Sequence, residues 1–346
     1  MSDTLPFAGI FGELSGPGGL APNSVRLVFD AIFSGAWTSA QIGGFLVALR
    51  LQGDSAEVIR AAAEAMRAVM IPVEHDFETL LDTCGTGGDG SHTLNLSTGA
   101  AIIAAAAGVP VAKHGNRAAT SKSGSADVLE ALGIPLDVPC AAQVDVLRDA
   151  RIAFLFAGAH HPAMRHAMPI RRELGIRTLF NCLGPLANPA RVSHQLLGAY
   201  DDAIRPILAE ALRGLGTRRA WVVRSSDGMD EVSPCARTRV TELSGGKLSE
   251  FEIAPEDFGI APLSAADIRG AEPASNAAAL LAVLAGEPHP ARDAFVLNAA
   301  AALCVALELQ PKQAADRARE ALESGAAQRT LETWRKSALA RRVPAR

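Results

Sequence analysis

In the first fifth of the chain, apolar residues recur at the three-to-four spacing of an amphipathic helix. Two apolar faces of this kind are formed by Leu27, Val28, Ala31 and Ile32, and by Ile42, Phe45, Leu46 and Leu49. We therefore expect residues 23–70 to form a group of helices, whose apolar faces need a common core.

Local signals mark the ends of these helices. Thr38 and Gln41 have the spacing of a capping box before the second helix, and Gly53 is expected to end that helix. Asp54 and Glu57 predict another capping box before the third helix.

After Ile71 and Pro72 the pattern changes to short apolar runs that alternate with helical segments. We expect strands at residues 80–83, 110–113, 134–137, 153–156, 220–224 and around 237–242, and helices at 98–107, 126–132 and 161–174. Such alternation is typical of an α/β domain with a mostly parallel sheet. The predicted fold has two domains joined by a hinge. Residues 1–72 form a small N-terminal helical domain, to which a helical segment near 160–190 also belongs, and residues 73–346 form a larger α/β domain.

Composition narrows the class of protein. The chain has 346 residues, 49% of them apolar and 20% charged, which suits two unequal globular domains. A formal net charge of −4 gives no general attraction to nucleic acid, so any anionic ligand needs a local site. Five scattered cysteines without CxxC spacing favour the reducing cytoplasm. The N-terminus lacks a signal-peptide pattern and the apolar runs are short, so we expect no membrane partner. The basic end, residues 335–346, is expected to be a solvated tail rather than a partner-binding arm.

Four glycines in six positions follow the first predicted strand. Between Gly85 and Gly90, backbone amides can point toward a ligand without side chains blocking its approach. The spacing differs from GxGxxG and from GxxxxGK[ST], which disfavours a nicotinamide cofactor or simple ATP binding. The loop is therefore expected to bind phosphate, with a flexible connector as the alternative.

Polar side chains continue this pattern at Thr93, Asn95, Ser97 and Thr98, directly before an alanine-rich helix. Ser97 or Thr98 is expected to cap the helix, whose positive end would face the same space as the glycine loop. Two anion sites would then lie side by side, as a substrate with two phosphate groups requires.

The next strand end repeats the order of strand, polar glycine loop and helix. Its polar residues are Lys113, His114, Gly115, Asn116, Arg117, Ser121 and Ser125. Ligands of open α/β sheets bind at the carboxyl ends of strands, where both loops are expected to lie. Taken alone, Lys113 and Arg117 are equally well explained as solvated surface charges.

With these motifs in this order, the sequence resembles the anthranilate phosphoribosyltransferases. Further similar motifs lie at residues 124–130, 160–164, 169–171, 174–178, 181–189 and 227–231, so the likeness runs from about residue 23 to beyond 310. The resemblance implies the hinged two-domain fold shared with nucleoside phosphorylases, a homodimer formed through the helical domain, and a cytoplasmic enzyme of tryptophan biosynthesis. Such an enzyme transfers the phosphoribosyl group of 5-phosphoribosyl 1-diphosphate to the amine of anthranilate, with two Mg²⁺ ions.

The resemblance also implies site residues by position. It assigns phosphoribosyl diphosphate binding to Gly85, Gly88, Asp89, Thr93, Asn95, Leu96, Ser97, Thr98, Lys113, His114, Gly115, Asn116, Arg117, Ser121 and Ser125. It assigns anthranilate binding to Gly85, Asn116, His161, Arg171 and Pro185, and the metal to Ser97, Asp230 and Glu231.

The chemistry of these residues fits those roles. Adjacent acids such as Asp230 and Glu231 suit magnesium when phosphate oxygens and water complete its shell, although a surface turn is their ordinary explanation. Arg171 can bind both oxygens of a carboxylate, with the neighbouring Arg172 as a competitor. His114 is either a proton acceptor or a residue that orients its loop, and no residue is assigned with certainty as a general base.

Two other functions stay open from the sequence. A nucleoside phosphorylase of the same fold would use inorganic phosphate and need no magnesium pair. A non-catalytic nucleotide- or nucleic-acid-binding paralogue would be expected to have lost Arg171 or the acidic pair, and this chain has all three residues.

Overall fold

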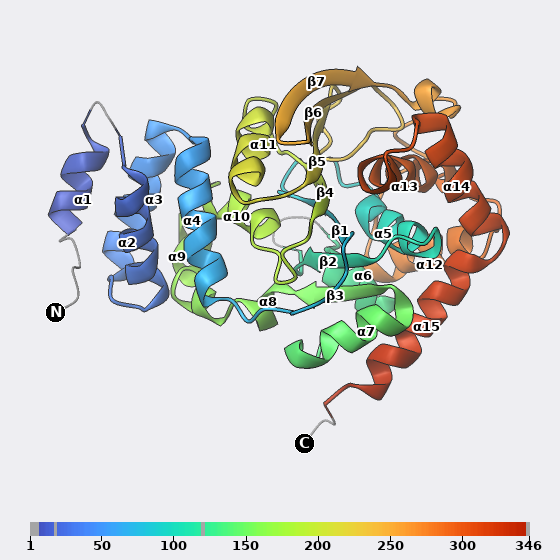
Figure 1. The fold of residues 1–346 in the computed structure, drawn as a ribbon, viewed down its shortest axis with the longest axis horizontal. Coiled ribbons are helices and arrows are strands. Elements are labelled where there is room, and N and C mark those ends of the chain that lie inside the picture. The colour runs from blue at the N-terminus through green and yellow to red at the C-terminus, as the bar shows by residue number, and fades with distance from the viewer. Residues whose placement is uncertain (1–6, 17–18, 119–121, 344–346) are drawn as a thin grey trace.

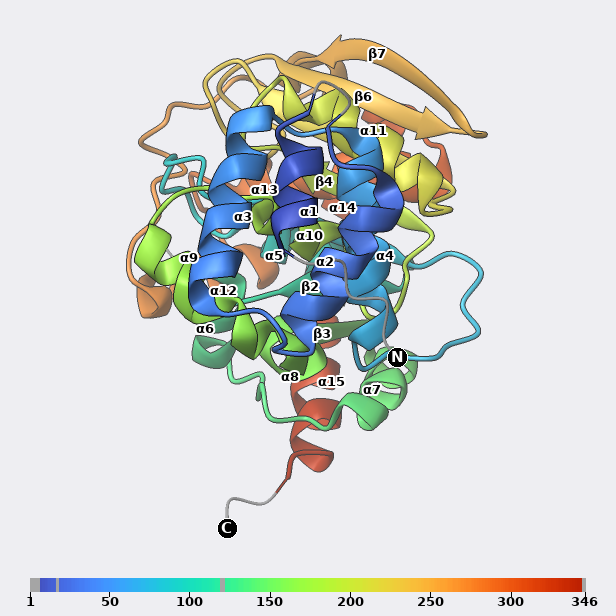
Figure 2. The same cartoon turned by 90° about the vertical axis from the view of Figure 1, so that its left-hand side faces the viewer.

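The computed structural model describes residues 7–16, 19–118 and 122–343. Four helices at one side of the molecule form the N-terminal layer (Figures 1 and 2): α1 (Phe7–Leu14), α2 (Pro22–Phe33), α3 (Ser39–Gln52) and α4 (Ala56–Val69). The predicted helices of this region are therefore confirmed. Their apolar faces meet in a shared core that includes Phe29, Phe45 and Ile59.

The helix ends follow the local signals in one case and depart from them in another. Gln41 N–H donates to Thr38 Oγ1 at 3.3 Å, and Thr38 N–H donates to Gln41 Oε1 at 2.9 Å, which completes the predicted capping box. The predicted box of Asp54 and Glu57 is wrong, because Ser55 caps α4 by accepting from Val58 N–H at 3.2 Å.

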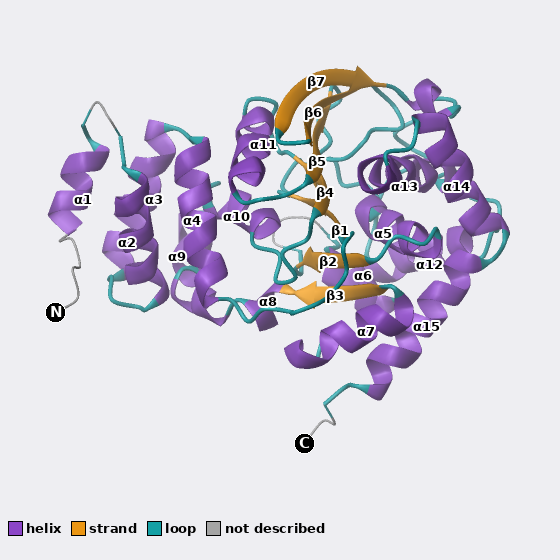
Figure 3. Cartoon of the chain, viewed as in Figure 1, coloured by secondary structure: helices purple, strands orange, loops and turns teal. Residues whose placement is uncertain are grey.

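The larger part of the chain is built on one seven-stranded sheet (Figure 3). The strand order is β3-β2-β1-β4-β5-β6-β7, and the first five strands in that order are parallel while β6 and β7 are antiparallel. The strands are β1 (Leu81–Gly85), β2 (Val111–Gly115), β3 (Ile152–Phe156), β4 (His194–Gly198), β5 (Arg219–Ser225), β6 (Thr238–Ser244) and β7 (Lys247–Ile253). The mostly parallel sheet agrees with the predicted fold class.

The strand predictions need correction at three places. Residues 134–137 form no strand, because Ile134 N–H donates to Leu129 O and the segment closes the end of α6 (Ser125–Ala131) instead of joining the sheet. Strands β4 and β7 were not predicted, and β7 carries exposed polar residues that mask its alternation.

Each face of the sheet has its own hydrophobic core. Neighbouring residues of one strand point to opposite faces, so Leu196 and Val223 join one core while Leu197 and Val222 join the other. On the face toward the N-terminal helices lie α8 (Ala157–His160), α9 (Met168–Leu174), α10 (Phe180–Leu186) and α11 (Ile204–Gly214). Around the other side lie α5 (Leu96–Ala106), α6, α7 (Gln143–Ala150), α12 (Pro273–Leu284), α13 (Arg292–Leu307), α14 (Pro311–Glu323) and α15 (Ala326–Ala340).

Close packing between α5 and α13 sets the position of α5. A Cβ atom at Gly99 would overlap the ring of Phe295, so only glycine lets these two helices approach so closely. Helix α5 is thereby fixed against a fully buried helix, and its N-terminal end is held at the edge of the sheet.

The segment that leaves the helical layer is pinned to the larger part of the chain. Ile71 N–H donates to His160 O, and His160 Nδ1 donates to Ile71 O, both at 2.8 Å. Helix α10 also packs on the helical layer, since the rings of Phe180 and Phe29 lie 5.5 Å apart. The two layers therefore meet along a packed seam as well as through one connecting segment.

The basic C-terminal segment is better ordered than expected of a solvated tail. Helix α15 runs to Ala340, Arg341 pairs with Asp149 at 2.9 Å, and Arg342 pairs with Asp137 at 2.7 Å. The prediction of a solvated tail is wrong for residues 335–343.

Within the described ranges no single helix is long and apolar enough to cross a membrane. One pair, α13 with α14, reaches that length and hydropathy only when the two helices are taken together across a bend of 116°.

Candidate functional site

The glycine loop leaves β1 at the edge where the parallel strands end. Gly87, Gly88 and Gly90 have φ values of 70°, 74° and 77°, in the left-handed region that favours glycine. Gly85 has a different reason, because a Cβ atom there would lie 2.5 Å from Asp230 Oδ2. The loop is therefore shaped both by its own turn and by an acidic residue far along the chain.

The acidic pair lies directly against the glycine loop. Asp230 Oδ2 accepts from Gly87 N–H at 2.8 Å, and Asp230 N–H donates to Asp89 Oδ2 at 3.3 Å. Glu231 Oε1 accepts from Ser97 N–H, in the first turn of α5, at 3.0 Å. The fold thus brings together the glycine loop, the start of α5 and the acidic pair, as the site prediction requires.

The pKa values of two carboxylates in this cluster are raised. Burial, followed by the charge of Asp89, raises the pKa of Asp230 from 3.8 to about 6. Burial, followed by the charge of Asp230, raises the pKa of Glu231 from 4.5 to about 8. Glu231 Oε2 is shielded from solvent and has no hydrogen-bond partner among the described residues. A cation beside these oxygens would stabilise the charged carboxylates and so oppose both shifts.

The donor set fits magnesium better than a metal held by protein alone. In the described part of the chain, no three His, Cys, Asp or Glu side chains converge as a metal-binding group. Magnesium is commonly held by one or two carboxylates, with phosphate oxygens and water completing its six ligands. The unpartnered oxygen of Glu231 beside a phosphate-type loop meets that requirement.

Lys113 directs its ammonium group toward the end of β1 and the start of α5. Its side chain is fully buried, and its ammonium group donates to Thr83 O and, at 3.2 Å, to Ser97 Oγ. Burial lowers the pKa of Lys113, while the charge of Asp82 opposes that change. Lys113 therefore acts on the acidic cluster through Ser97, which its hydrogen bond orients.

The start of α5 differs from the predicted cap. The helix begins at Leu96 and its N-cap position is Asn95, which makes no capping hydrogen bond with its side chain. Ser97 and Thr98 lie inside the first turn. Ser97 N–H donates to Glu231 Oε1, and Thr98 Oγ1 has no hydrogen-bond partner among the described residues. The prediction that Ser97 or Thr98 caps the helix is wrong. The Ser97 amide at the start of the helix donates instead to the carboxylate of Glu231.

The loop after β2 contributes backbone more than charge. Arg117 is exposed and pairs with Glu130 at 2.5 Å and with Asp127 at 3.1 Å, both on α6. Its guanidinium is thus engaged on the neighbouring helix, while Asn116 O accepts from Ser125 Oγ at 3.3 Å. A Cβ atom at Gly115 would overlap Ser125 Oγ, which explains a glycine at this position. Ser121 lies outside the described residues.

Two buried histidines form a chain of hydrogen bonds beside α10. His114 Nδ1 lies 2.8 Å from Gly184 O and His114 Nε2 lies 3.2 Å from His161 Nε2. Because a carbonyl can only accept, His114 carries its proton on Nδ1, and His161 donates from Nε2. Burial, followed by the charge of His160, lowers the pKa of His161 to about 4. Burial, followed by the charge of His161, lowers the pKa of His114 well below its ordinary range. Both rings are therefore neutral at physiological pH.

Arg171 is a half-buried guanidinium without an acidic partner among the described residues. Its Nη1 lies 3.6 Å from Met168 Sδ, and its Cζ lies 5.3 Å above the ring of Phe180. Burial lowers the pKa of Arg171. Arg172 is exposed, so the two neighbouring arginines point to different environments. An unpaired, partly desolvated guanidinium is well suited to bind a carboxylate ligand.

Most of the chain is similar to proteins of one family. Residues 78–328 match the α/β domain of the glycosyl transferase family, and residues 14–70 match its helical bundle domain. The anthranilate phosphoribosyltransferase of Methylobacterium radiotolerans is 51% identical over 317 residues, which cover 91% of this chain and 92% of that protein. The chain belongs to the anthranilate phosphoribosyltransferase family.

Solved structures of the family share the fold. The anthranilate phosphoribosyltransferase of Thermus thermophilus has a TM-score of 0.88 at 39% identity, covering 95% of this chain and 98% of that one. The Saccharomyces cerevisiae enzyme in complex with PRPP and Mg has a TM-score of 0.88 at 30% identity, covering 96% and 98%. The nucleoside phosphorylase and the non-catalytic paralogue are thus not favoured.

One residue that contacts the glycine loop was not among the predicted site residues. Arg177, between α9 and α10, donates to Gly88 O, and its Cζ lies 4.8 Å above the ring of Tyr200. Tyr200 OH in turn lies 3.5 Å from Asp54 Oδ2 in the helical layer. Arg177 belongs to the motif at residues 174–178, but sequence alone gave no reason to place that motif at the loop.

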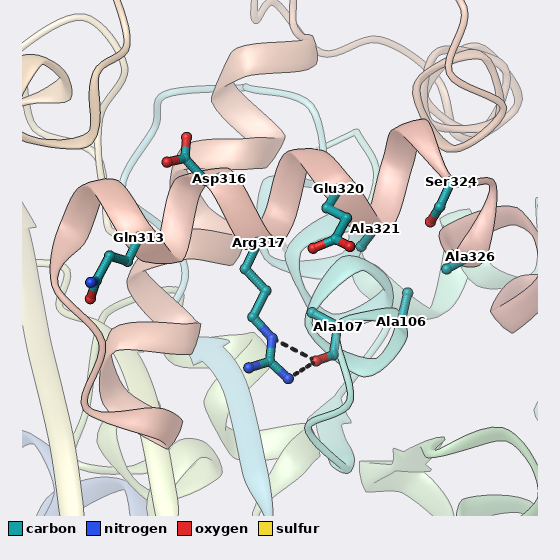
Figure 4. A pocket seen from close by; sticks show the side chains of 9 residues that line it. All are labelled: Ala106, Ala107, Gln313, Asp316, Arg317, Glu320, Ala321, Ser324 and Ala326. Carbon is teal, nitrogen blue, oxygen red and sulfur yellow. Dashed lines mark hydrogen bonds between the residues drawn. The ribbon is translucent and has the colours of Figure 1, made fainter.

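One hollow in the described part of the chain lies away from these residues, on other elements (Figure 4). It measures about 590 Å³ and lies between α5 and α14. Arg317 crosses it, and its Nε and Nη2 donate to Ala107 O at 3.0 and 2.7 Å, at the end of α5. The arginine of this hollow is therefore used to cap a helix, and the hollow shares no residue with the acidic cluster.

Proposed function

We propose that the chain transfers the phosphoribosyl group of 5-phosphoribosyl 1-diphosphate to the amine of anthranilate, giving N-(5-phosphoribosyl)anthranilate and diphosphate. The single observation that carries this proposal is the unpartnered, buried Glu231 oxygen beside a glycine loop that is folded around Asp230. A phosphate loop and an uncompensated acidic pair together call for a phosphorylated ligand that brings a cation. In this family that ligand is the phosphoribosyl donor.

Magnesium would be held by Ser97, Asp230 and Glu231, with two ions proposed. When bound, it would neutralise the charge that builds on the diphosphate as the bond to C1 of the ribose breaks. The chain's own part is to orient these ligands: Lys113 fixes the Ser97 hydroxyl, and Gly87 N–H fixes one oxygen of Asp230.

The phosphoribosyl diphosphate site is proposed at the loops that end β1 and β2. Gly88 and Asp89 would meet the diphosphate, while Asn95 and the start of α5 would meet the phosphoribosyl group, as the donors of Asn95 and the helix dipole favour. The remaining proposed contacts are Gly85, Thr93, Leu96, Ser97, Thr98, His114, Gly115, Asn116, Ser121 and Ser125. Lys113 and Arg117 are proposed to act indirectly, since protein groups occupy both of their charges.

Anthranilate is proposed to bind with its carboxylate on Arg171. Gly85, Asn116, His161 and Pro185 would line the space for its ring. His114 cannot act as a free base in the described arrangement, because His161 occupies its acceptor nitrogen. None is required, since the positively charged amine that first forms is acidic enough to lose a proton to water or to diphosphate. Catalysis would then rest on positioning and electrostatics.

Three further properties of the chain are proposed: its oligomeric state, its location and its division into domains. The chain is proposed to form a homodimer through its helical layer, where Phe11 on α1 is 48% exposed. We propose the cytoplasm as its location. The division into residues 1–72 with a segment near 160–190, and residues 73–346, is proposed as the hinge-separated pair of domains.

The decisive test is turnover of anthranilate followed by its fluorescence. Purified, folded chain is mixed with 5-phosphoribosyl 1-diphosphate, and the assay is repeated with Mg²⁺ and with EDTA. We expect fluorescence loss that requires both the phosphoribosyl donor and the metal. No turnover from folded protein in saturating Mg²⁺ would overturn the proposed function, and equal turnover in EDTA would overturn the metal assignment alone.

A further inference from the structure

Two buried asparagines stand on the C-terminal helices, in a part of the chain to which no function has been assigned. Asn276 on α12 is 3% exposed and Asn298 on α13 is 2% exposed. A buried amide destabilises the fold unless its hydrogen bonds are made, so the partners of such a residue report what it holds in place.

Asn276 holds the side chain of Asn95. Its Oδ1 accepts from Ala271 N–H at 2.7 Å, which leaves Nδ2 to donate to Asn95 Oδ1 at 3.0 Å. Asn95 Oδ1 also accepts from Ser123 Oγ at 3.2 Å, and Asn95 Nδ2 donates to Ser123 O at 3.2 Å. Turning the Asn95 amide over would oppose donor to donor, so this network fixes its orientation.

The backbone repeats the same junction. Leu94 N–H donates to Ile268 O at 2.9 Å, and Gly270 N–H donates to His92 O at 2.8 Å. A Cβ atom at Gly270 would overlap Thr93 O. The segment before α12 is therefore packed directly beneath the polar turn that precedes α5, with no space between them.

Asn298 holds the backbone next to the acidic pair. Its Oδ1 accepts from Val232 N–H at 3.1 Å, and its Nδ2 donates to Val232 O at 3.0 Å and to Ala294 O at 3.0 Å. Both polar groups of Val232 are thus bound by one side chain, and Val232 directly follows Glu231. Rotation of the acidic pair would break both bonds.

We propose that Asn276 and Asn298 are positioning residues for two different parts of the reaction site. Asn276 acts through Asn95 on the binding of phosphoribosyl diphosphate, and Asn298 acts through Val232 on the binding of magnesium by Asp230 and Glu231. This inference rests on the proposed function. It assigns a role in substrate and metal binding to helices whose side chains touch neither ligand.

A role in stability alone makes a different prediction. A variant that only weakens the fold lowers the melting temperature and the amount of active enzyme, while the Michaelis constants of the folded fraction stay as they were. A positioning residue changes one constant and leaves the others. Each asparagine is therefore the control for the other.

The test compares Asn276→Asp and Asn298→Asp, which keep the shape of the side chain and remove its donor. For Asn276→Asp we expect KM for phosphoribosyl diphosphate to rise about tenfold, the size of effect left by one unsatisfied buried group, with the Mg²⁺ half-saturation and KM for anthranilate unchanged. For Asn298→Asp we expect the Mg²⁺ half-saturation to rise about tenfold, with KM for phosphoribosyl diphosphate unchanged at saturating Mg²⁺. Ser337→Ala on α15, which removes a hydrogen bond to Asp149 elsewhere in the same layer, should change neither.

Two additions keep the result decisive. The double variant Asn276→Asp with Asn95→Ala should be no worse than Asn95→Ala alone, because both remove one linkage. Asn276→Ser and Asn298→Ser, which retain a small donor, replace any aspartate variant that does not fold. Unchanged constants in folded variants, or the same change in both, would overturn the inference, whereas an inactive parent enzyme would instead contradict the proposed function.

Discussion

Replacing Glu231 by glutamine tests whether this carboxylate is held in an unfavourable state until a cation arrives. In the metal-free protein the pKa of Glu231 is raised from 4.5 to about 8, chiefly by burial. A raised pKa means that the folded state favours the protonated acid, so stability is fully present below pH 4.5 and is lost as the pH rises through 8. Glu231→Gln mimics the protonated form at every pH and should not lose this stability.

The size of the effect follows from the two pKa values. At about 1.4 kcal/mol per pKa unit, the difference between 4.5 and about 8 has an upper limit of about 5 kcal/mol. Glu231 as a whole residue is only half-buried, so nearby water weakens this electrostatic penalty. We therefore expect an effect of about 2 to 4 kcal/mol on the free energy of unfolding. For a chain of 346 residues that corresponds to roughly 3 to 6 °C in melting temperature.

Scanning calorimetry in EDTA between pH 5 and pH 9 measures the effect. Glu231→Gln and the parent should melt together near pH 5, and the variant should melt several degrees higher at pH 8. Glu332→Gln, an exposed residue on α15, is the matched control and should follow the parent at every pH. A difference between variant and parent that does not grow with pH, or a parent that is the more stable at pH 8, would refute the reasoning.

Three further predictions concern the edges of the site. Arg171→Ala should raise KM for anthranilate about 10- to 100-fold, the loss of a charge-assisted pair, with little change for phosphoribosyl diphosphate; an equal rise in both constants in steady-state kinetics would mean that the residue is misplaced. Arg177→Ala should raise KM for phosphoribosyl diphosphate about two- to tenfold because Gly88 loses its support, and Arg172→Ala should not. His161→Asn should remove part of the loss of stability between pH 6.5 and 4, since the pKa of His161 is lowered to about 4 and only the unfolded chain takes up the proton there; the predicted gain is about 2 kcal/mol at pH 5 by denaturant unfolding, and an unchanged pH slope would contradict it.

Features that depend on a few neighbouring residues were the ones that sequence predicted well. The capping box of Thr38 and Gln41 is a local exchange of two hydrogen bonds, and it forms as its spacing indicates. The box predicted for Asp54 failed because Ser55 competes for the same role, and Asp54 is drawn instead toward Arg50 and Tyr200. The position of the Asp54 side chain depends on Tyr200, which lies far along the chain and so is not part of any local pattern.

The same division holds for the site. Motifs at residues 85–90 and 227–231 were correctly expected to belong to one family pattern, yet their contact between Gly85 and Asp230 is a matter of strand order. Charges were harder still: sequence could not tell that Arg117 would pair with α6 or that the ammonium of Lys113 would be buried under β1. Neutralising partners are chosen by three-dimensional proximity, so the type of residue gives only its capability.

The unpaired atoms of the site indicate how its ligands must influence one another. Glu231 Oε2 has no partner in the described structure, and the pKa of Asp230 and of Glu231 is raised chiefly by burial and by the surrounding negative charge. Diphosphate alone would add negative charge and worsen this repulsion, while magnesium alone would lack most of its oxygen ligands. Each should therefore bind more tightly in the presence of the other, and by linkage the two enhancements must be equal. Glu231→Gln should reduce that mutual enhancement more than it reduces the binding of either ligand alone, because it removes the charge through which they are coupled.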